Sequence, residues 1–214
     1  MSLGGPGASP GTVAAAVPTG NTYDKYGSTN PVVRRLMHGF EASLARLYAR
    51  AAPGSVLDVG CGEGVLTYRW AEELGERRIV GIDLEDPKLR SEWATRERPN
   101  LEFRAASSDA LPFGAGEFDL AAAIEVLEHV PDPRQTLAEM ARVAAGHLLV
   151  SVPREPLWRG LNLARGAYLR ELGNTPGHLN HWSRRAFAQL LEGYGEVIET
   201  SSPFPWTMLL VRVG

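Results

Sequence analysis

The sequence has little of what marks secreted, membrane-spanning or nucleic-acid-binding proteins. Its 214 residues include a single cysteine, Cys61, so no internal disulfide can form and a reducing cytosol is the expected compartment. No run of about 18 apolar residues is present, so we expect no membrane-spanning helix. The N-terminus lacks the basic segment of a secretory signal. A net charge of −3 offers no general attraction for nucleic acids or anionic membranes.

The composition that remains is that of one globular domain. Hydrophobic residues make up 44% of the chain and charged residues 22%, both ordinary values. Residues 1–21 consist mostly of Gly, Pro, Ala, Ser and Thr, which predicts a disordered leader. We therefore expect a single domain over residues 22–214.

Strand and helix patterns alternate from residue 31 to residue 152. Asn30-Pro31 predicts the start of a helix whose apolar stripe recurs at helical spacing, and Pro53-Gly54 its end. Further helices carry Leu66, Trp70 and Leu74, ended by Gly75, and then Leu89 and Trp93. Short apolar strands are expected at 55–60, 78–84, 101–106, 118–124 and 147–152, and the stripe of the first helix is Val33, Leu36, Met37, Phe40, Leu44, Leu47 and Tyr48.

The helix before the fifth strand has its own start and stop signals. Asp132-Pro133 predicts its N-terminus, with Gln135 placed for a capping box. Gly146 predicts its end. The residues expected to face the core are Leu137, Met140, Ala141 and Ala144. Because strands and helices alternate, the fold class is predicted as α/β, a Rossmann-like doubly wound sheet with helices on both faces.

The C-terminal part departs from this alternation. Residues 153–182 form an insertion, expected to lie on the substrate side, in which one stripe predicts a helix. A regular helix begins near Ser183, and the strands 195–202 and 207–214 are joined by a short segment, which favours an antiparallel pair. The sheet should thus have seven strands, mostly parallel with an antiparallel last strand. The stripe of the insertion is Leu157, Leu161, Ala164, Tyr168 and Leu172.

The stretch LDVGCGEG, residues 57–64, is a buried strand that runs into a glycine-rich turn. A dinucleotide site would place its third glycine at position 65, which is Val65. Asp58 beside the turn would repel a pyrophosphate but suits a cation. Asp83 ends the next strand, 19 residues after Gly64, where an acid can accept both hydroxyls of a ribose.

These motifs resemble the class I methyltransferases that use S-adenosylmethionine. LDVGCGEG, VGIDLE, SSDALPF and FDLAAAIEVLEHVPDP are similar to that family's successive motifs over residues 30–214. The resemblance implies that Asp83 holds the ribose and that Asp58 attracts the ammonium of the cofactor. It also implies that Asp109 meets the adenine amino group and that Ala110 covers the ring. The implied cofactor residues are Asp58, Gly60, Cys61, Gly62, Asp83, Leu84, Ser108, Asp109, Ala110, Ile124 and Glu125.

The methyl acceptor is predicted to be a small molecule, methylated at oxygen. Its site should involve the insertion and an N-terminal segment with Tyr23 and Tyr26, because loops carry substrate choice. His129 and His178 are the candidates for taking the substrate proton, since a neutral imidazole can deprotonate a hydroxyl. EVLEHVPDP and a histidine near position 178 are similar to the ubiquinone-pathway O-methyltransferases.

A metal-assisted reaction is an alternative. Glu125, Glu128 and His129 lie at i, i+3 and i+4, which would put them on one face of a helical turn. Together with a later histidine, His178 or His181, they would bind a divalent cation. That pattern is similar to the small-RNA 2′-O-methyltransferases. The subgroup expects a further histidine where this chain has Val130, so no metal is assigned.

Two alternatives lie outside the methyltransferases. A nicotinamide-dependent oxidoreductase would use the same kind of sheet, but Val65 counts against it. A non-catalytic module that keeps only the cofactor pocket is the other. The sequence itself does not reveal the oligomeric state.

Overall fold

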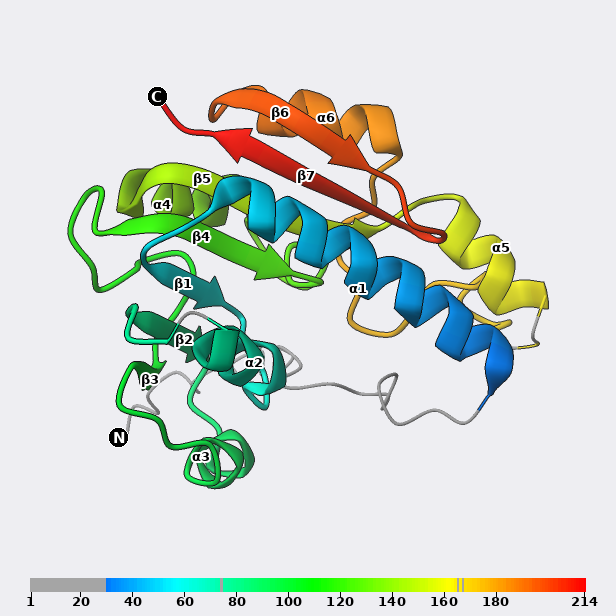
Figure 1. Cartoon of the computed structure of the whole chain (residues 1–214). Helices are drawn as coiled ribbons and strands as arrows, with labels where there is room; N and C mark the ends of the chain where they lie inside the picture. The colour runs from blue at the N-terminus through cyan, green and yellow to red at the C-terminus, as the bar shows by residue number, and fades with distance from the viewer. Residues whose placement is uncertain (1–29, 74, 165, 167) are drawn as a thin grey trace, which may run out of the picture.

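The computed structural model describes residues 30–73, 75–164, 166 and 168–214 (Figure 1). The leader, Tyr23, Tyr26 and Leu74 lie outside the described residues. Within them, no helix is both long and apolar enough to cross a membrane. The helices are α1 (Pro31–Ala51), α2 (Val65–Glu73), α3 (Pro87–Trp93), α4 (Pro133–Val143), α5 (Leu157–Ala164) and α6 (Arg184–Leu191). The strands are β1 (Val56–Val59), β2 (Ile79–Asp83), β3 (Leu101–Ala105), β4 (Phe118–Ile124), β5 (Ala144–Pro153), β6 (Glu196–Ser201) and β7 (Trp206–Arg212).

The seven strands form one sheet in the order β3-β2-β1-β4-β5-β7-β6. Strands β1 to β5 pair in parallel, while β7 runs antiparallel to both β5 and β6. The predicted fold class is therefore confirmed. The chain moves outward from β1 to β3 and then returns to the other side of β1 with β4. The carboxyl ends of β1 and β4 thus flank the position where open α/β sheets bind ligands.

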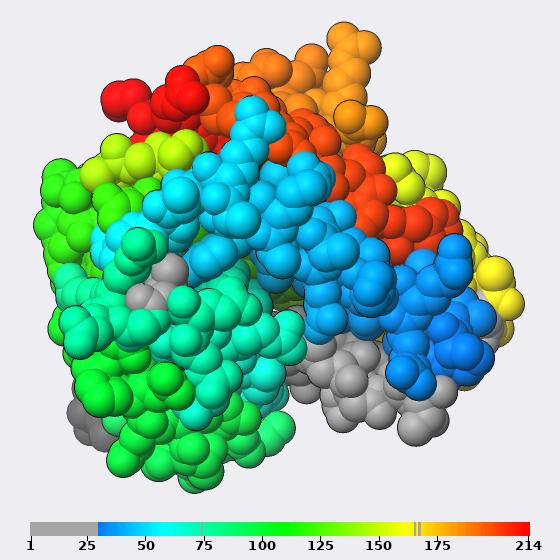
Figure 2. Space-filling view, in the orientation of Figure 1, coloured from blue at the N-terminus to red at the C-terminus, as the bar shows by residue number. Residues whose placement is uncertain are grey.

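Helices cover both faces of the sheet, as the alternating pattern predicted. The long helix α1 lies against β5 and β7 and crosses the face shown in Figure 2. Its start is fixed by the Asn30 carboxamide, which accepts the Val32 N–H at 2.9 Å. Most of its apolar stripe is buried, including Phe40 and Leu47 at 0% exposure, whereas Val33 and Leu36 are half-buried. On the opposite face, α4 and α6 bury Leu137, Met140 and Phe187 against the same strands.

Helix α4 is shorter than its sequence pattern predicted. It ends at Val143, and Ala144 already has extended backbone angles as the first residue of β5. The prediction that Ala144 faces inward from the helix and that Gly146 ends it is wrong. The reason lies in the sheet, because Ala144 pairs with Phe118 of β4 before the predicted strand begins. An extended backbone at Ala144 allows hydrogen bonds between β5 and β4 that a further helical turn would not allow.

The insertion also contains a shorter helix than predicted. Helix α5 ends at Ala164, and Gly166 follows in the left-handed region with φ of 72°. Tyr168 and Leu172 lie beyond it, at positive φ, and Leu172 is 73% exposed. A glycine in this conformation ends a helix readily. The five-residue stripe therefore does not form one buried helical face.

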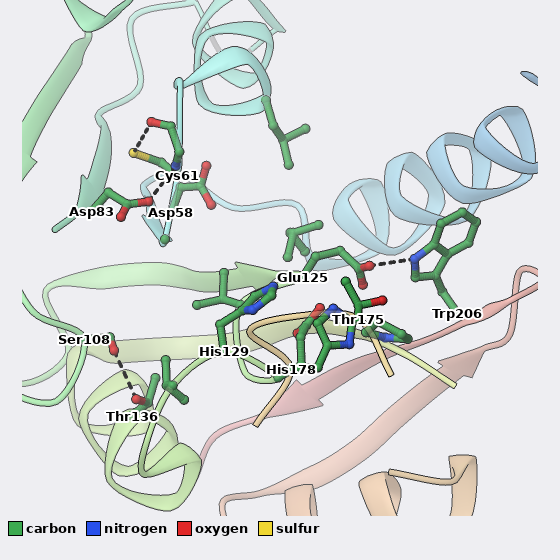
Figure 3. A pocket seen from close by; sticks show the side chains of 18 of the residues that line it. Asp58, Cys61, Asp83, Ser108, Glu125, His129, Thr136, Thr175, His178 and Trp206 are labelled. Atoms are coloured by element: carbon green, nitrogen blue, oxygen red, sulfur yellow. Dashed lines mark hydrogen bonds between the residues drawn. The ribbon is translucent and has the colours of Figure 1, made fainter. Parts of the chain in front are cut away.

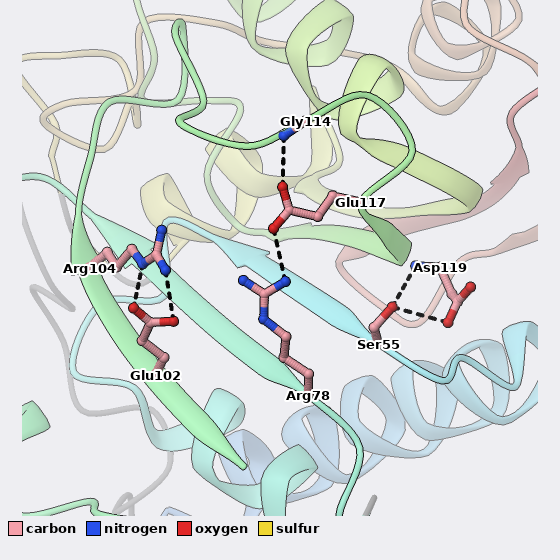
Figure 4. A network of polar contacts seen from close by, with 7 residues as sticks. All are labelled: Ser55, Arg78, Glu102, Arg104, Gly114, Glu117 and Asp119. Atoms are coloured by element: carbon pink, nitrogen blue, oxygen red, sulfur yellow. Dashed lines mark hydrogen bonds and ion pairs between the residues drawn. The ribbon is translucent and has the colours of Figure 1, made fainter. Parts of the chain in front are cut away.

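Polar contacts join the amino ends of the strands, at the edge opposite the ligand position (Figure 4). The Ser55 hydroxyl donates to Asp119 at 3.0 Å, and Arg78 donates to Glu117 at 2.8 Å. Glu117 also accepts the Gly114 N–H at 2.7 Å. These side chains are exposed, so each ion pair contributes about 0–1 kcal/mol. They hold loops at one end of the sheet and leave the other end open for a site.

Candidate active site

A cavity of about 700 Å³ opens at the carboxyl ends of β1, β2 and β4. Its volume lies in the usual range for small-molecule sites. Ala110 is exposed and does not line the cavity, so its predicted place over a ring stays a prediction. The other predicted residues all line it: Asp58, Gly60, Cys61, Gly62, Asp83, Leu84, Ser108, Asp109, Ile124, Glu125, His129 and His178.

The glycine turn after β1 is required by the fold itself as well as by a ligand. Gly60, Gly62 and Gly64 have φ of 72°, 54° and 77°, a region that other residues rarely adopt. A Cβ on Gly60 would lie 2.5 Å from Val126, and one on Gly64 would lie 2.5 Å from the Phe103 ring. The turn therefore fits tightly against its protein neighbours, with its backbone along the cavity wall.

Asp83 at the end of β2 is held by the turn. Its two carboxylate oxygens accept the N–H of Gly62 at 2.8 Å and the N–H of Leu84 at 2.7 Å (Figure 3). Burial raises the pKa of Asp83, whereas these two N–H groups favour its charged form. Each carboxylate oxygen can accept a second hydrogen bond. Asp83 therefore retains the capacity to bind a diol from the cavity.

Asp58 is the most buried acid of this part of the cavity, at 2% exposure. Its carboxylate accepts a hydrogen bond from the Thr67 hydroxyl at 2.6 Å. Burial is the main reason that its pKa is raised to about 7; the nearby Asp83 charge acts in the same direction, and the Thr67 hydrogen bond acts against both. A cation placed beside Asp58 would lower that pKa, so the site favours a positively charged group. Burial also raises the pKa of the adjacent Cys61 thiol, which keeps it protonated and a poor nucleophile.

The loop after β3 meets α4 beside the cavity. The Ser108 and Thr136 hydroxyls lie 3.1 Å apart, and the Gln135 amide donates to the Asp109 carbonyl at 2.9 Å. Asp132 caps α4 as predicted, accepting the N–H of Gln135 at 3.0 Å. The predicted capping box is wrong in its second half, because the Gln135 side chain turns to the loop. Gln135 thereby fixes the backbone at Asp109.

The spacing of Glu125, Glu128 and His129 predicted that they share one helical face. That prediction is wrong for Glu125. Its backbone is left-handed, with φ of 63°, so the turn that follows begins only at Val126. Its carboxylate accepts the Ser151 hydroxyl at 3.0 Å. It also accepts the Trp206 indole N–H at 2.6 Å (Figure 3). Glu125 is thus directed toward β5 and β7.

His129 and His178 come together, edge to face, with ring centroids 4.9 Å apart. The Nδ1 of His129 lies 2.9 Å from the Gly177 carbonyl, which can only accept, so Nδ1 carries a proton. A neutral His129 therefore has its lone pair on Nε2. Glu128, His129 and His178 offer ligand atoms that all lie within 4.8 Å of one another. His181 is not part of this group, although its ring centroid lies 6.5 Å from that of His178, and it hydrogen-bonds Asn174 at 2.6 Å.

Several residues that line the cavity were missed by the sequence reasoning, and four of them are aromatic or polar residues from the C-terminal half of the chain. Trp158, Asn162 and Thr175 belong to the insertion, and Trp206 begins β7. No motif marks them, because they come from segments that meet only in the folded chain. The one available signal was the aromatic content of a region already expected to face the substrate.

The comparisons with known proteins agree with this geometry. Residues 33–200 match the methyltransferase domain family. A demethylmenaquinone methyltransferase from Shouchella clausii is 28% identical over 193 residues, covering 86% of this chain and 78% of that protein. A ubiquinone biosynthesis O-methyltransferase from Methylococcus capsulatus is 31% identical over 159 residues, covering 65% of each. The solved structure of magnesium protoporphyrin IX methyltransferase from Synechocystis with bound SAH has a TM-score of 0.62 at 17% identity, covering 89% of this chain and 94% of that chain.

A doubly wound sheet with a glycine turn after β1 and an acid at the end of β2 is typical of α/β proteins that bind nucleosides. Since the match covers most of the chain, the protein belongs to the methyltransferase domain family. It is an S-adenosylmethionine-dependent methyltransferase, and not the oxidoreductase or non-catalytic module that were alternatives.

Proposed function

We propose that the protein transfers a methyl group from S-adenosylmethionine to a hydroxyl oxygen of a small molecule. The observation that carries the proposal is that one cavity is lined both by Asp58 and Asp83 and by His129 and His178. A cofactor and an acceptor could therefore bind next to each other in the same cavity, so the methyl group would pass directly from one to the other. The printed names of two relatives, which refer to demethylmenaquinone and to O-methylation in ubiquinone biosynthesis, support a small-molecule acceptor.

The lining residues fit this cofactor in charge. Among the described residues, seven acids and no lysine or arginine line the cavity: Asp58, Glu63, Asp83, Asp109, Glu125, Glu128 and Asp132. Such a lining suits an ammonium and a sulfonium and disfavours phosphate. Asp83 would hold the ribose, Asp58 the ammonium, and Ser108 and Asp109 the base. When bound, S-adenosylmethionine supplies a methyl group on a positively charged sulfur.

His129 is proposed as the group that receives the hydroxyl proton. Its Nδ1–H is fixed on the Gly177 carbonyl, which leaves Nε2 as the basic nitrogen. His178 packs edge-on against it and restricts the orientation of its ring. Holding the acceptor in line with the methyl group accounts for up to ~7–11 kcal/mol of barrier reduction, more than proton transfer alone supplies.

The test is methylation of a panel of phenols, catechols, quinols and nucleosides, with the product located by mass spectrometry and NMR. His129→Gln is expected to lower the rate by about 10²- to 10⁴-fold while S-adenosylhomocysteine binds as before. His147→Gln is the control, because His147 lies on β5 and does not line the cavity. Methylation at nitrogen or carbon, or an unchanged rate in His129→Gln, would overturn the proposal.

A metal-assisted form of the reaction is the second candidate, and the cluster of Glu128, His129 and His178 favours it. Glu128 is 2% exposed, which suits a carboxylate that binds a cation. A histidine that donates Nδ1–H to a carbonyl presents Nε2 in the usual manner of a metal ligand. A divalent cation there would acidify the acceptor hydroxyl. An RNA acceptor is not favoured, because the described lining residues include no lysine or arginine.

Calorimetry with Mg²⁺, Mn²⁺ and Zn²⁺ separates the two forms independently of activity. The metal-assisted form predicts saturable binding that Glu128→Gln abolishes, and activity lost to a chelator and restored by one of these ions. Full activity in the chelator, together with no measurable metal binding, leaves His129 as a base without a metal.

A further inference from the structure

The part of the cavity that faces away from Asp83 is built differently from the cofactor side. Figure 3 shows Asp58, Cys61 and Asp83 at one end, and Thr175, His178 and Trp206 at the other. We name this second part the acceptor chamber. Its lining residues are Leu36 and Met37 of α1, Trp158 and Leu161 of α5, Thr175 of the following loop and Trp206 of β7.

Two tryptophans form one corner of the acceptor chamber, with ring centroids 5.8 Å apart and planes tilted by 52°. The indole N–H of Trp206 donates to Glu125, and that of Trp158 donates to Thr175 at 2.9 Å. Both polar atoms are bound to protein, so the part of each indole that lines the cavity is aromatic ring; Trp158 is half-buried, and Trp206 is 4% exposed and packs edge to face with Phe40. Such a corner suits a flat ring, which gains from offset or edge contacts with each indole.

Thr175 adds one polar contact with a defined direction. Its hydroxyl oxygen accepts from Trp158 and also from the Asn162 amide at 3.1 Å. Asn162 is itself buried and donates to the Gly173 carbonyl at 2.8 Å. With both lone pairs of the hydroxyl used, Thr175 can act toward a ligand only as a donor. It therefore suits an oxygen on the acceptor ring.

The charge of the surrounding wall restricts the acceptor further. Glu125 and Glu128 line the cavity beside Trp206 and His178, and the described lining residues include no cationic side chain except protonated histidine. An acceptor with a carboxylate or phosphate would enter a partly dry site against charges of its own sign. A neutral or positively charged ring meets no such repulsion, and aromatic faces attract cations.

We infer that the acceptor chamber selects a flat aromatic acceptor that carries no anionic group, seated in the corner of Trp158 and Trp206. The inference rests on the proposed function, because it assumes that methyl transfer takes place in this cavity. It adds the class of acceptor and assigns the selectivity to Trp158, Trp206 and the acidic lining.

Binding of three matched probes tests the charge selectivity without requiring turnover. The probes are 4-methylcatechol, dopamine and 3,4-dihydroxybenzoate, measured by equilibrium dialysis against protein saturated with S-adenosylhomocysteine. We expect 4-methylcatechol and dopamine to bind. The dissociation constant of 3,4-dihydroxybenzoate should be at least about tenfold higher than theirs. Equal or stronger binding of the carboxylate, or no binding of any probe to the cofactor-loaded protein, would overturn the inference.

Two lysine substitutions on the same helix provide a matched test. Leu161→Lys places a positive charge in the wall of the chamber, whereas Leu163→Lys places it on the outside, where Leu163 is 42% exposed. Leu161→Lys should strengthen binding of the carboxylate probe about tenfold and weaken that of dopamine similarly. Leu163→Lys should leave both unchanged. The same response in both variants, or in neither, would contradict the assigned chamber.

The two levels of proposal fail in different ways. A protein that does not bind S-adenosylhomocysteine at all would overturn the proposed function and the inference with it. A protein that binds S-adenosylhomocysteine and methylates only anionic acceptors would overturn the inference alone.

Discussion

Asp58 links ionisation to folding and, if it binds the cofactor ammonium as proposed, to cofactor binding as well. Its pKa of about 7 in the folded protein lies above the 3.8 of a free aspartate, because it is buried. The folded protein therefore holds a proton that the unfolded chain has lost between pH 4 and 7. Stability from this group is full below about pH 4 and is lost as the pH rises to about 7. The proposed contact with a cofactor ammonium would stabilise the charged form of Asp58 and offset part of this loss of stability.

The first prediction concerns Asp58→Asn, which keeps an oxygen for Thr67 and removes the charge. At pH 8 the cofactor-free variant should be more stable than the parent by up to about 4 kcal/mol, taking about 1.4 kcal/mol per pKa unit. It should also bind S-adenosylhomocysteine roughly tenfold or more weakly, with an affinity that no longer rises between pH 5.5 and 7.5. Urea unfolding and dialysis across this pH range measure both effects. A less stable variant that binds normally would contradict the assignment.

The second prediction concerns the diol contact. Asp83→Ala removes the acceptor of two backbone N–H groups and of the proposed ribose hydroxyls. The dissociation constant for S-adenosylhomocysteine should rise about tenfold to more than a hundredfold, equivalent to roughly 1.5–3 kcal/mol. Glu85→Ala is the control, since Glu85 pairs with Arg90 on the surface and does not line the cavity. An unchanged constant in folded Asp83→Ala would count against the ribose contact.

At the scale of single elements, two glycines make opposite predictions for the same substitution. Gly64→Ala places a methyl group against Phe103 at a positive φ, so it should destabilise the fold by about 1–3 kcal/mol. Gly39→Ala lies inside α1 with nothing within 4 Å of the new Cβ, so it should stabilise by about 0.5–1 kcal/mol. Thermal unfolding of both variants decides. Equal effects on the two would mean that the turn is not packed as described.

Some features of the fold and the candidate site could be predicted from the sequence, and others could not. The glycine turn, Asp83 and the N-caps of α1 and α4 were predictable, because each depends on residues close together in the chain. The position of Glu125 was not, since helical spacing was assumed where the backbone turns left-handed. Trp206 and Thr175 had no local signal at all. Their places follow from the antiparallel register of β7, in which Trp206 pairs with Pro153, and from the path of the insertion.

At the scale of the whole molecule, cofactor binding should appear as added stability. A ligand that binds only the folded chain at a hundred times its dissociation constant adds about 2.7 kcal/mol. For a domain of this size, that should raise the midpoint of thermal unfolding by roughly 5–11 °C. NAD at the same concentration is the control and should give no shift. A shift with NAD and none with S-adenosylhomocysteine would contradict the cofactor assignment.

The bond between Glu125 and Trp206 joins positions 81 residues apart, and one of them begins the last strand. During synthesis, β1 to β4 leave the ribosome well before that strand does. The corner that Trp206 and Glu125 form therefore exists only once β7 has paired with β5. A chain cut before Trp206 would lack this corner, and with it the wall that we propose receives the acceptor.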